Sequence, residues 1–305
     1  MEPSYLTCGK HLEMRSGIVR SVRRFFYVRD YLEVETPVRI PCPIPEAHID
    51  VFESEGFCLH ASPEICMKQL LARGYERIFQ IARVFRKHER GDKHLPEFSL
   101  LEWYASGATY LDLMDQIEAL VLEVSADMRK GRTLQYQGHC ISLKPPWDRL
   151  TVREAFDRYG TMDLEKALEQ DMFDEVMGLE IEPRLGFERP VFLYDYPESK
   201  ASLARLKPGN PPVAERMELY IAGLELANGF TELNDPEEQI RRFTAEHALR
   251  ERLGKKNYPL PAPFLKALHQ MPGAAGIAVG LDRLIMLFCD AKTIDDVVAF
   301  VPENL

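Results

Sequence analysis

Two arginines, Arg86 and Arg283, stand at the ends of segments that predict regular structure, and they could act together on a phosphate chain. The alternating segment 79–86 predicts a strand that ends at Arg86, and Arg283 follows the glycine-rich segment 276–282 where a helix is expected to begin. A guanidinium is always charged and binds phosphate oxygens in a fixed fork. Two of them on separate rigid elements could grip a triphosphate from two sides, which favours attack at the α-phosphate.

The segment 97–104 predicts a strand with an unusual combination of side chains on one face. Because side chains alternate across a sheet, Phe98, Leu100, Glu102 and Tyr104 share a face. A buried core face would not include a carboxylate, since an unpaired buried charge is unfavourable. We therefore expect a floor that stacks a nucleobase and binds an amine. The alternative is a solvent-facing row on an edge strand.

Glu225 and Glu232 lie on either side of Asn228-Gly229, a dipeptide typical of two-residue hairpin turns. A hairpin at this point would place the two carboxylates directly opposite each other, with Cβ atoms about 5 Å apart. A bound cation or a cationic substrate would relieve their repulsion, and magnesium accompanying ATP is the expected candidate. A bulge at Gly229 could instead bring both onto one face. Two exposed glutamates screened by water remain a further alternative.

The segment 276–280 alternates small residues and leads into an apolar helix. Glycine lets a ligand approach the backbone, and a helix start favours anions. The segment has neither the P-loop pattern nor the dinucleotide spacing, so by itself it is weak evidence for a phosphate site. Arg283 at the start of the helix makes the indication more specific. His94 is a candidate phosphate contact, although a lone histidine is more often structural. No arrangement of residues predicts a protein nucleophile.

The elements that position these residues follow from apolar spacing and turn residues. Apolar residues over 14–26 predict a helix ending near Asp30, followed by a short strand over 32–36 that Pro37 stops. The remaining pattern predicts a helix over about 62–73, strands on either side of the loop 88–96, a long helix over 111–128 and mostly helical structure over 151–186. We see no repeat and no linker, so one domain with an inserted helical section is expected.

Composition limits the class of partner. The 305 residues are 46% apolar, enough for a substantial core, and the formal net charge is −10. This charge gives no general attraction to polyanions, so transfer RNA is a disfavoured partner. The basic residues near the N-terminus fit a solvated helix face better than a nucleic-acid site. No long apolar run predicts a signal peptide or a membrane span, so we expect a cytoplasmic protein without a membrane partner.

Together these residues resemble a class II aminoacyl-tRNA synthetase of the lysyl branch, from about residue 14 to 301. Three segments are similar to the three motifs of that class and stand in the same order: 24–37, 85–98 and 280–283. Segments 62–64 and 225–233 are similar to lysyl-type signatures. The resemblance implies an α+β fold with a mostly antiparallel sheet flanked by helices. It also implies a single catalytic domain over 1–305, an insertion at about 130–215 and a homodimer built around Pro37.

A narrower resemblance follows from the first motif, which begins within the first turns of the chain. Lysyl-tRNA synthetases carry an N-terminal OB-fold domain that binds the anticodon, and none is expected here. The chain therefore looks like the elongation factor P–(R)-β-lysine ligase family, which activates (R)-β-lysine with ATP and transfers it to elongation factor P. Ala278 agrees with that family, because lysyl-tRNA synthetases usually have glycine there, and its methyl group is expected to reshape the pocket. Lysine as substrate, a transfer RNA or other acceptor, and a catalytically silent regulatory paralogue remain alternatives.

The resemblance also implies roles for individual residues. Arg86 and Arg283 would be the catalytic pair, on the α- and γ-phosphates of ATP, with Arg86 also holding the substrate carboxylate. Nucleotide contacts are implied for Arg86, Lys87, His88, Phe98, Glu225, Leu226, Gly280 and Arg283. Amino-acid contacts are implied for Ser62, Pro63, Glu64, Tyr104, Glu232 and Ala278, and magnesium contacts are expected for Glu225 and Glu232.

The second motif departs from the family pattern at two positions. His88 stands where the family usually has glutamate, with Glu89 one residue later, and Leu95 replaces a common asparagine. Either Glu89 takes over the contact to adenine, or adenine is held in a different way.

Overall fold

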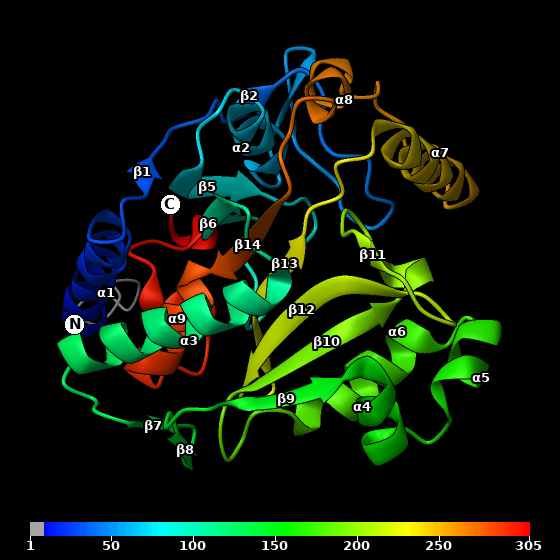
Figure 1. The fold of residues 1–305 in the computed structure, drawn as a ribbon. Coiled ribbons are helices and arrows are strands. Elements are labelled where there is room, and N and C mark those ends of the chain that lie inside the picture. The colour runs from blue at the N-terminus through cyan, green and yellow to red at the C-terminus, as the bar shows by residue number, and fades with distance from the viewer. Residues whose placement is uncertain (1–8) are drawn as a thin grey trace.

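A computed structural model describes residues 9–305, and one large sheet runs through it (Figure 1). Its strands are β1 (Leu32–Glu33), β5 (Arg77–Phe85), β6 (Glu97–Ser106), β9 (Asp148–Thr151), β10 (Val191–Pro197), β11 (Leu206–Lys207), β12 (Val213–Ile221), β13 (Leu224–Thr231) and β14 (Ala274–Gly280). They follow the order β1-β5-β6-β14-β13-β12-β10-β9, and β11 pairs with β12. Within this sheet β1 pairs with β5, and β9 with β10, in parallel, whereas the other pairs are antiparallel. The expected mostly antiparallel α+β fold is confirmed.

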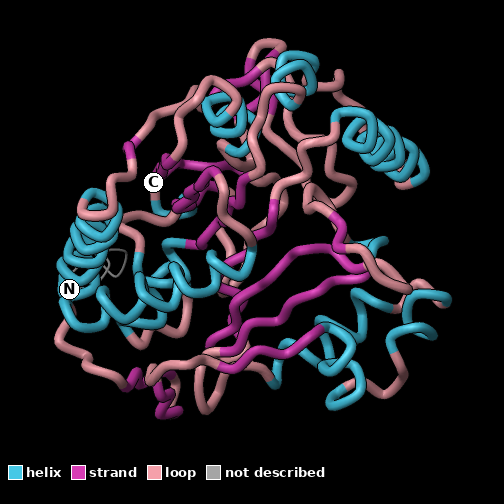
Figure 2. The backbone as a smooth tube through the Cα atoms, viewed as in Figure 1, coloured by secondary structure: helices cyan, strands magenta, loops and turns pink. Residues whose placement is uncertain are grey.

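Helices cover both faces of the sheet. One face packs against α1 (Gly9–Tyr27), α3 (Tyr110–Asp127) and α9 (Leu281–Cys289). The other packs against α2 (Glu64–Leu71), α4 (Val152–Tyr159), α5 (Leu164–Glu169), α6 (Phe173–Val176), α7 (Pro236–Arg252) and α8 (Ala262–Leu268). Figure 2 shows the strands between these outer helices. Each face therefore has its own apolar core.

Short elements complete the chain. The small strands are β2 (Arg39–Ile40), β3 (Glu53–Ser54), β4 (Phe57–Leu59), β7 (Thr133–Tyr136) and β8 (His139–Ser142). The short helical turns are η1 (Met177–Ile181), η2 (Glu182–Arg184), η3 (Glu198–Lys200), η4 (Ile294–Val297) and η5 (Pro302–Asn304). Within residues 9–305, no helix combines the length and the apolar character that spanning a membrane requires.

Alternation along β6 separates the core from the site. Leu101 and Trp103 are fully buried in the core formed with α1 and α3, where Phe26 stacks on Phe79 with ring centroids 4.6 Å apart. The residues between them therefore point to the opposite face of the sheet. Because β6 lies between β5 and β14, it is an inner strand, and the edge-strand alternative is excluded.

The stretch 130–215 is only partly helical. Helices and helical turns occupy residues 152–184, but β9, β10 and β11 in the same stretch belong to the main sheet. Strands β9 and β11 are too short to show a clear alternation, so their place in the sheet depends on tertiary pairing. The sheet thus continues through the segment that was expected to be a helical insertion.

The predicted hairpin at Asn228-Gly229 is wrong, because both residues lie inside β13. The turn is formed by Ala222 and Gly223, which have left-handed φ angles of 52° and 68° and join β12 to β13. Gly229 instead allows close approach of β14, since a Cβ atom there would lie 2.9 Å from the Cβ of Ile277. The Asn-Gly pair therefore serves strand packing and not a turn.

The two carboxylates beside this pair consequently do not face each other. Glu225 pairs with Tyr220 in the sheet, and Glu232 forms an isolated bridge with Ala204. A β-bulge does occur in β13, but it lies at Leu226 and not at Gly229. Tyr220 pairs with Glu225 whereas Leu219 pairs with Ala227, so Leu226 is the extra residue between the two pairs.

Candidate active site

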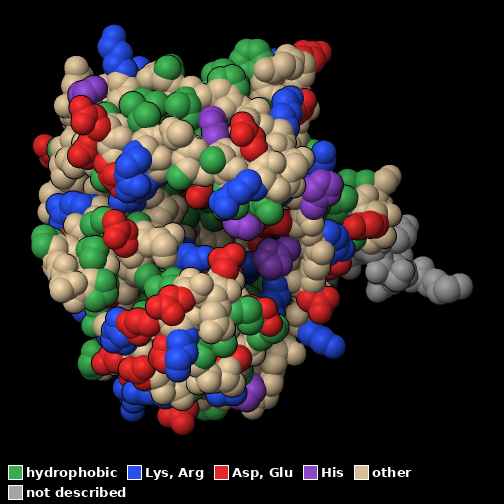
Figure 3. Space-filling view, turned by 90° about the vertical axis from the view of Figure 1, so that its right-hand side faces the viewer, with side chains coloured by type: hydrophobic (Ala, Val, Ile, Leu, Met, Phe, Trp, Pro, Cys, Tyr) green, Lys and Arg blue, Asp and Glu red, His purple; other side chains and the backbone are tan. Residues whose placement is uncertain are grey.

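Arg86 and Arg283 line one cavity of about 320 Å³, as the sequence predicts. Strands β6, β13 and β14 contribute to its walls, and the loop between β5 and β6 lies at one side. The predicted row of Phe98, Leu100, Glu102 and Tyr104 is confirmed, because all four residues line this cavity. Figure 3 shows a face of the molecule that is hollowed near its middle, with Lys, Arg and His side chains around the hollow.

Arg283 is held in position by neighbouring acceptors. Its Nη1 donates to the carbonyl oxygen of Glu225 at 2.7 Å, and the Glu225 carboxylate lies 3.3 Å from the same atom. Its Nη2 lies 2.6 Å from Nε2 of His94. Burial, reinforced by the charge of Arg283, lowers the pKa of His94 to about 4, so the ring is neutral at pH 7 and Nε2 can accept this bond.

Arg86 has unused donor capacity. Its guanidinium carbon lies 5.2 Å from the ring centroid of Phe98, and the Glu89 carboxylate is 3.9 Å from Nη1. Its Nε is buried and has no hydrogen-bond partner among residues 9–305. A buried donor without a partner is unfavourable, so this atom fits an anionic ligand in the cavity.

An acidic cluster occupies another part of the cavity. Glu102 accepts hydrogen bonds from the hydroxyl groups of Ser62 at 2.6 Å and Tyr104 at 2.9 Å. Burial and the nearby charge of Glu64 nevertheless raise the pKa of Glu102 to about 7. Burial also raises the pKa of Glu232 to about 8. Such carboxyls ionise readily when a cation arrives, so this end can bind ammonium groups.

Strand β14 forms the floor of the cavity with small residues. Gly276 pairs with Tyr104 across the sheet, and a Cβ atom at this position would collide with the Tyr104 ring and the Glu232 carboxylate. Ala278 and Gly280 also line the cavity, and Ala278 lies between Asn228 and Glu102 on the neighbouring strands. Small side chains along β14 therefore create the volume that a ligand needs.

Most of the predicted site residues come together, and four do not line the cavity; one of these, Glu232, lies directly behind Gly276 of the lining. Those that line it besides the residues above are Ser62, Glu64, Glu225 and Leu226. The other three, Pro63, Lys87 and His88, are not among its lining residues either. His88 is exposed with a left-handed φ of 69°, whereas Glu89 lines the cavity. This placement favours the expectation that Glu89, and not His88, reaches the nucleotide.

Glu225 lies beside a carboxylate that the sequence analysis did not select. Burial and the charge of Glu218 raise the pKa of Glu225, while Arg283 opposes this rise. Glu218 is buried on β12, where it accepts hydrogen bonds from Arg216 at 2.7 Å and Tyr220 at 2.6 Å. The acidic neighbour of Glu225 is thus Glu218, whereas Glu232 forms an ion pair with Lys68.

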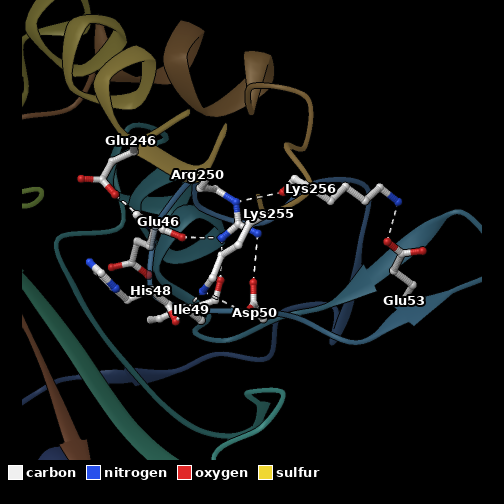
Figure 4. A network of polar contacts seen from close by, with 10 residues as sticks. Glu46, His48, Ile49, Asp50, Glu53, Glu246, Arg250, Lys255 and Lys256 are labelled. Carbon is white, nitrogen blue, oxygen red and sulfur yellow. Dashed lines mark hydrogen bonds and ion pairs between the residues drawn. The ribbon is translucent and has the colours of Figure 1, made fainter. Parts of the chain in front are cut away.

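The loop 46–50 forms another part of the site that the sequence analysis missed. Glu46 and Ile49 line the cavity, and burial, with the nearby charge of Glu64, raises the pKa of Glu46 to about 7. Arg250 of α7 holds this loop by donating to the carbonyl oxygens of Glu46 at 2.7 Å and Ile49 at 2.9 Å (Figure 4). Only long-range packing creates this contact, so no local signal could have predicted it.

Comparison with known proteins identifies the family. Residues 6–304 match the class II tRNA synthetases (D, K and N). The chain belongs to this family. It is 36% identical over 308 residues to the elongation factor P–(R)-beta-lysine ligase of Vibrio atlanticus, with 95% of each chain covered. It is 37% identical over 307 residues to the ligase of the same name from Vibrio cholerae, covering 95% of this chain and 94% of that one.

A lysine–tRNA ligase of Magnetococcus marinus is also similar, with 36% identity over 313 residues that cover 94% of this chain and 62% of that one. Within this class II synthetase chain, the second and third motif segments both contribute to the cavity. The first motif segment instead forms the last turn of α1 and the strand β1 at the edge of the sheet. Two of the three motif segments therefore meet at this cavity.

Proposed function

We propose that this class II synthetase chain activates (R)-β-lysine, or lysine, with ATP and transfers it to a lysine side chain of elongation factor P. One observation carries the proposal. Arg86 and Arg283 line one part of a single cavity, whereas the buried carboxyl of Glu102 lines another part and that of Glu232 lies beside it. Arginines suit phosphates and a carboxylate, and buried acids suit amines. The names of the similar ligases support the choice of amino acid and acceptor.

The reaction needs no protein nucleophile. Arg86 would neutralise the substrate carboxylate and the α-phosphate while a carboxylate oxygen attacks the α-phosphorus in line. The bond to the β-phosphate breaks, pyrophosphate leaves with the electron pair, and an acyl-adenylate remains. A neutral lysine amine of the acceptor then attacks the acyl carbon, AMP leaves, and the amine proton passes to solvent. Arg283 would hold the γ-phosphate and Phe98 would stack on adenine, so positioning and charge neutralisation account for the rate.

Magnesium fits beside Glu225. Among residues 9–305 no group of three or more possible ligands gathers around one point. Magnesium often binds through one or two carboxylates together with substrate phosphates, so Glu225, with Glu218 as its neighbour, satisfies this need. The ion would neutralise charge on the triphosphate. Glu232 is the weaker metal candidate because it already faces Lys68, and we assign it to the substrate amine.

The acceptor is tested by intact mass. Elongation factor P is incubated with the enzyme, ATP and (R)-β-lysine, and its mass is expected to rise by one β-lysyl group. Factor whose amines have been blocked by reductive methylation should gain nothing. Unchanged mass of the unblocked factor, together with charging of a transfer RNA, would replace this acceptor by the transfer RNA.

The affinity for the diamino acid should depend on pH. A protonated Glu102 or Glu232 carries no charge, so binding of an ammonium group must release its proton. Since the pKa values of these free carboxyls are raised to about 7 and about 8, KM should fall as pH rises from 6 to about 9 and then level off. Titration calorimetry in two buffers of different ionisation enthalpy should detect the released protons. A KM that is constant or rises over this range would contradict the assignment, and KM for ATP serves as the control.

We further propose that the chain forms a homodimer at the edge of the sheet near Pro37. Tyr27, Val28 and Leu32 are large apolar side chains at this edge, and each is at least half exposed. Pro37 is exposed beside them. A second copy of the chain that packs on this apolar patch removes it from water, which favours association.

Leu32→Glu should therefore convert dimers to monomers, because it places a charge in the interface. Light scattering after size exclusion at micromolar concentration measures the mass. Leu179→Glu, at an exposed leucine in η1, is the matched control and should leave dimers intact. A wild-type protein that is already monomeric would reject the proposed dimer.

A further inference from the structure

A buried lysine lies behind the acidic part of the cavity. Lys68 of α2 is 1% exposed, and its ammonium forms ion pairs with Glu64, one helical turn earlier, and with Glu232 after β13. The Phe230 ring closes another side, with its centroid 5.1 Å from Nζ. Although burial alone would lower the pKa of Lys68, the charges of Glu232 and Glu64 more than compensate and raise it above its ordinary value. Lys68 is therefore a fixed cation inside the protein.

This single cation faces more negative groups than it can neutralise. Glu64, Glu102 and Glu232 interact electrostatically with one another and with Tyr104, and Lys68 forms ion pairs with two of these carboxylates, Glu64 and Glu232. Three carboxylates and one ammonium leave two negative charges if every group is ionised. A diamino acid with two ammonium groups would supply the two missing positive charges. The pocket composition thus matches a substrate with two amines.

Other charged groups lie farther along the cavity and do not change this count. The charges of Glu64 and Glu246 raise the pKa of Glu46. Arg86 and Arg216 lower it and so partly offset this effect. Arg86 lowers the pKa of Glu102 as well, yet by less than Glu64 raises it. These groups belong to the part of the cavity assigned to the nucleotide and the substrate carboxylate.

The geometry also leaves one acceptor atom unused. Lys68 contacts Oε2 of Glu232, whereas Oε1 of Glu232 is buried and receives no hydrogen bond from any described residue. That oxygen lies next to Gly276 and Tyr104, which line the cavity. A buried acceptor of this kind needs a donor, and an ammonium group of the substrate would provide it.

We propose that Lys68 is a specificity-determining positioning residue, which orients Glu64 and Glu232 by binding both and so restricts the pocket to amino acids with two ammonium groups. The inference rests on the proposed function, since it assumes that the cavity binds a diamino acid. Lys68 would act through the two glutamates without touching the substrate. A buried ion pair that only stabilises the fold is the competing explanation.

The test compares Lys68→Met, which keeps the length and removes the charge, with Lys68→Arg, which keeps the charge. In pyrophosphate exchange, Lys68→Met should raise KM for the diamino acid by about 10- to 100-fold at pH 7, as expected when a charged partner is lost. The values of kcat and of KM for ATP should stay within about threefold. Lys68→Arg should recover most of the lost affinity. Lys266→Met, at an exposed lysine of the adjacent α8, is the control and should change nothing.

The pH profile separates the two explanations. Without the ammonium of Lys68, the glutamates hold their protons to higher pH, so KM of Lys68→Met should fall more steeply than wild-type KM between pH 8 and 9. A constant ratio of the two KM values at every pH would mean a purely structural role and would overturn the inference. Equal KM values in wild type and Lys68→Met would overturn it too.

Two controls keep the result interpretable. If Lys68→Met does not fold, Lys68→Gln takes its place, because its amide can still donate to a carboxylate but carries no charge, and the same shift in pH profile is expected. If wild-type protein shows no exchange with any diamino acid, the proposed function fails. If wild type is active and the variants match it, only the role of Lys68 fails.

Discussion

Arg283→Ala should lower pyrophosphate exchange by about 10³-fold, because the side chain would neutralise charge on the departing pyrophosphate and the loss of one preorganised charged donor has an effect of this size. The side chain reaches into the cavity between the carbonyl oxygen of Glu225 and the ring of His94. Removing it deprives the triphosphate of one of the two guanidinium groups that we assign to it. The fold should persist, since the side chain is 19% exposed and faces a solvent-connected cavity.

Exchange rates and thermal unfolding should be measured together. The matched control is Arg241→Ala on α7, where the guanidinium pairs with Glu238 at the surface and is 66% exposed. Arg241→Ala should exchange at the wild-type rate. An Arg283→Ala protein that is folded and exchanges normally would show that the third motif segment is misassigned.

Gly276→Ala should abolish amino-acid binding while nucleotide binding continues. The added methyl group would collide with the Tyr104 ring and with Oε1 of Glu232. Tyr104 cannot move freely, because its hydroxyl donates to Glu102 at 2.9 Å. Displacing it disrupts two of the proposed amine ligands at once, so KM for the diamino acid should rise by more than about 100-fold.

Titration calorimetry distinguishes the two ligands in this variant. The affinity for a non-hydrolysable ATP analogue should stay within about threefold of wild type, whereas heat from the diamino acid should disappear. Gly273→Ala is the matched control, because no atom lies within 4 Å of a Cβ atom built there. Normal amino-acid binding by Gly276→Ala would remove the acidic cluster from the proposed substrate site.

The parts of the site that the sequence predicts correctly depend on local regularity. Alternation along 97–104 placed Phe98, Glu102 and Tyr104 on one face, and the cavity lies on that face. Arg86 and Arg283 could be paired because each ends or begins a regular element. The resemblance to the lysyl branch added the order of the motifs, which the family match bears out.

The hairpin error has a different origin. Asn228-Gly229 has the composition of a tight turn, but two residues of β14 pack so closely on β13 that only glycine fits at 229. A turn residue and a close-packing residue look alike in one sequence. The true turn at Ala222-Gly223 has a weaker signal because alanine rarely adopts a left-handed φ.

Long-range contacts explain the residues that were missed. Lys68 stands four residues after Glu64, a spacing that indicates an ion pair on a helix. Its pairing with Glu232, 164 positions later by their numbers, depends on how α2 packs over the sheet. Glu46 likewise reaches the cavity only because Arg250 holds its loop.

Pyrophosphate exchange measured with lysine and with both β-lysine enantiomers tests the central claim most directly. The account predicts ATP-dependent exchange with at least one of these diamino acids, fastest with (R)-β-lysine, and none with norleucine, which lacks the distal amine. Absence of exchange with all of them would contradict the claim that this cavity joins a diamino acid to AMP.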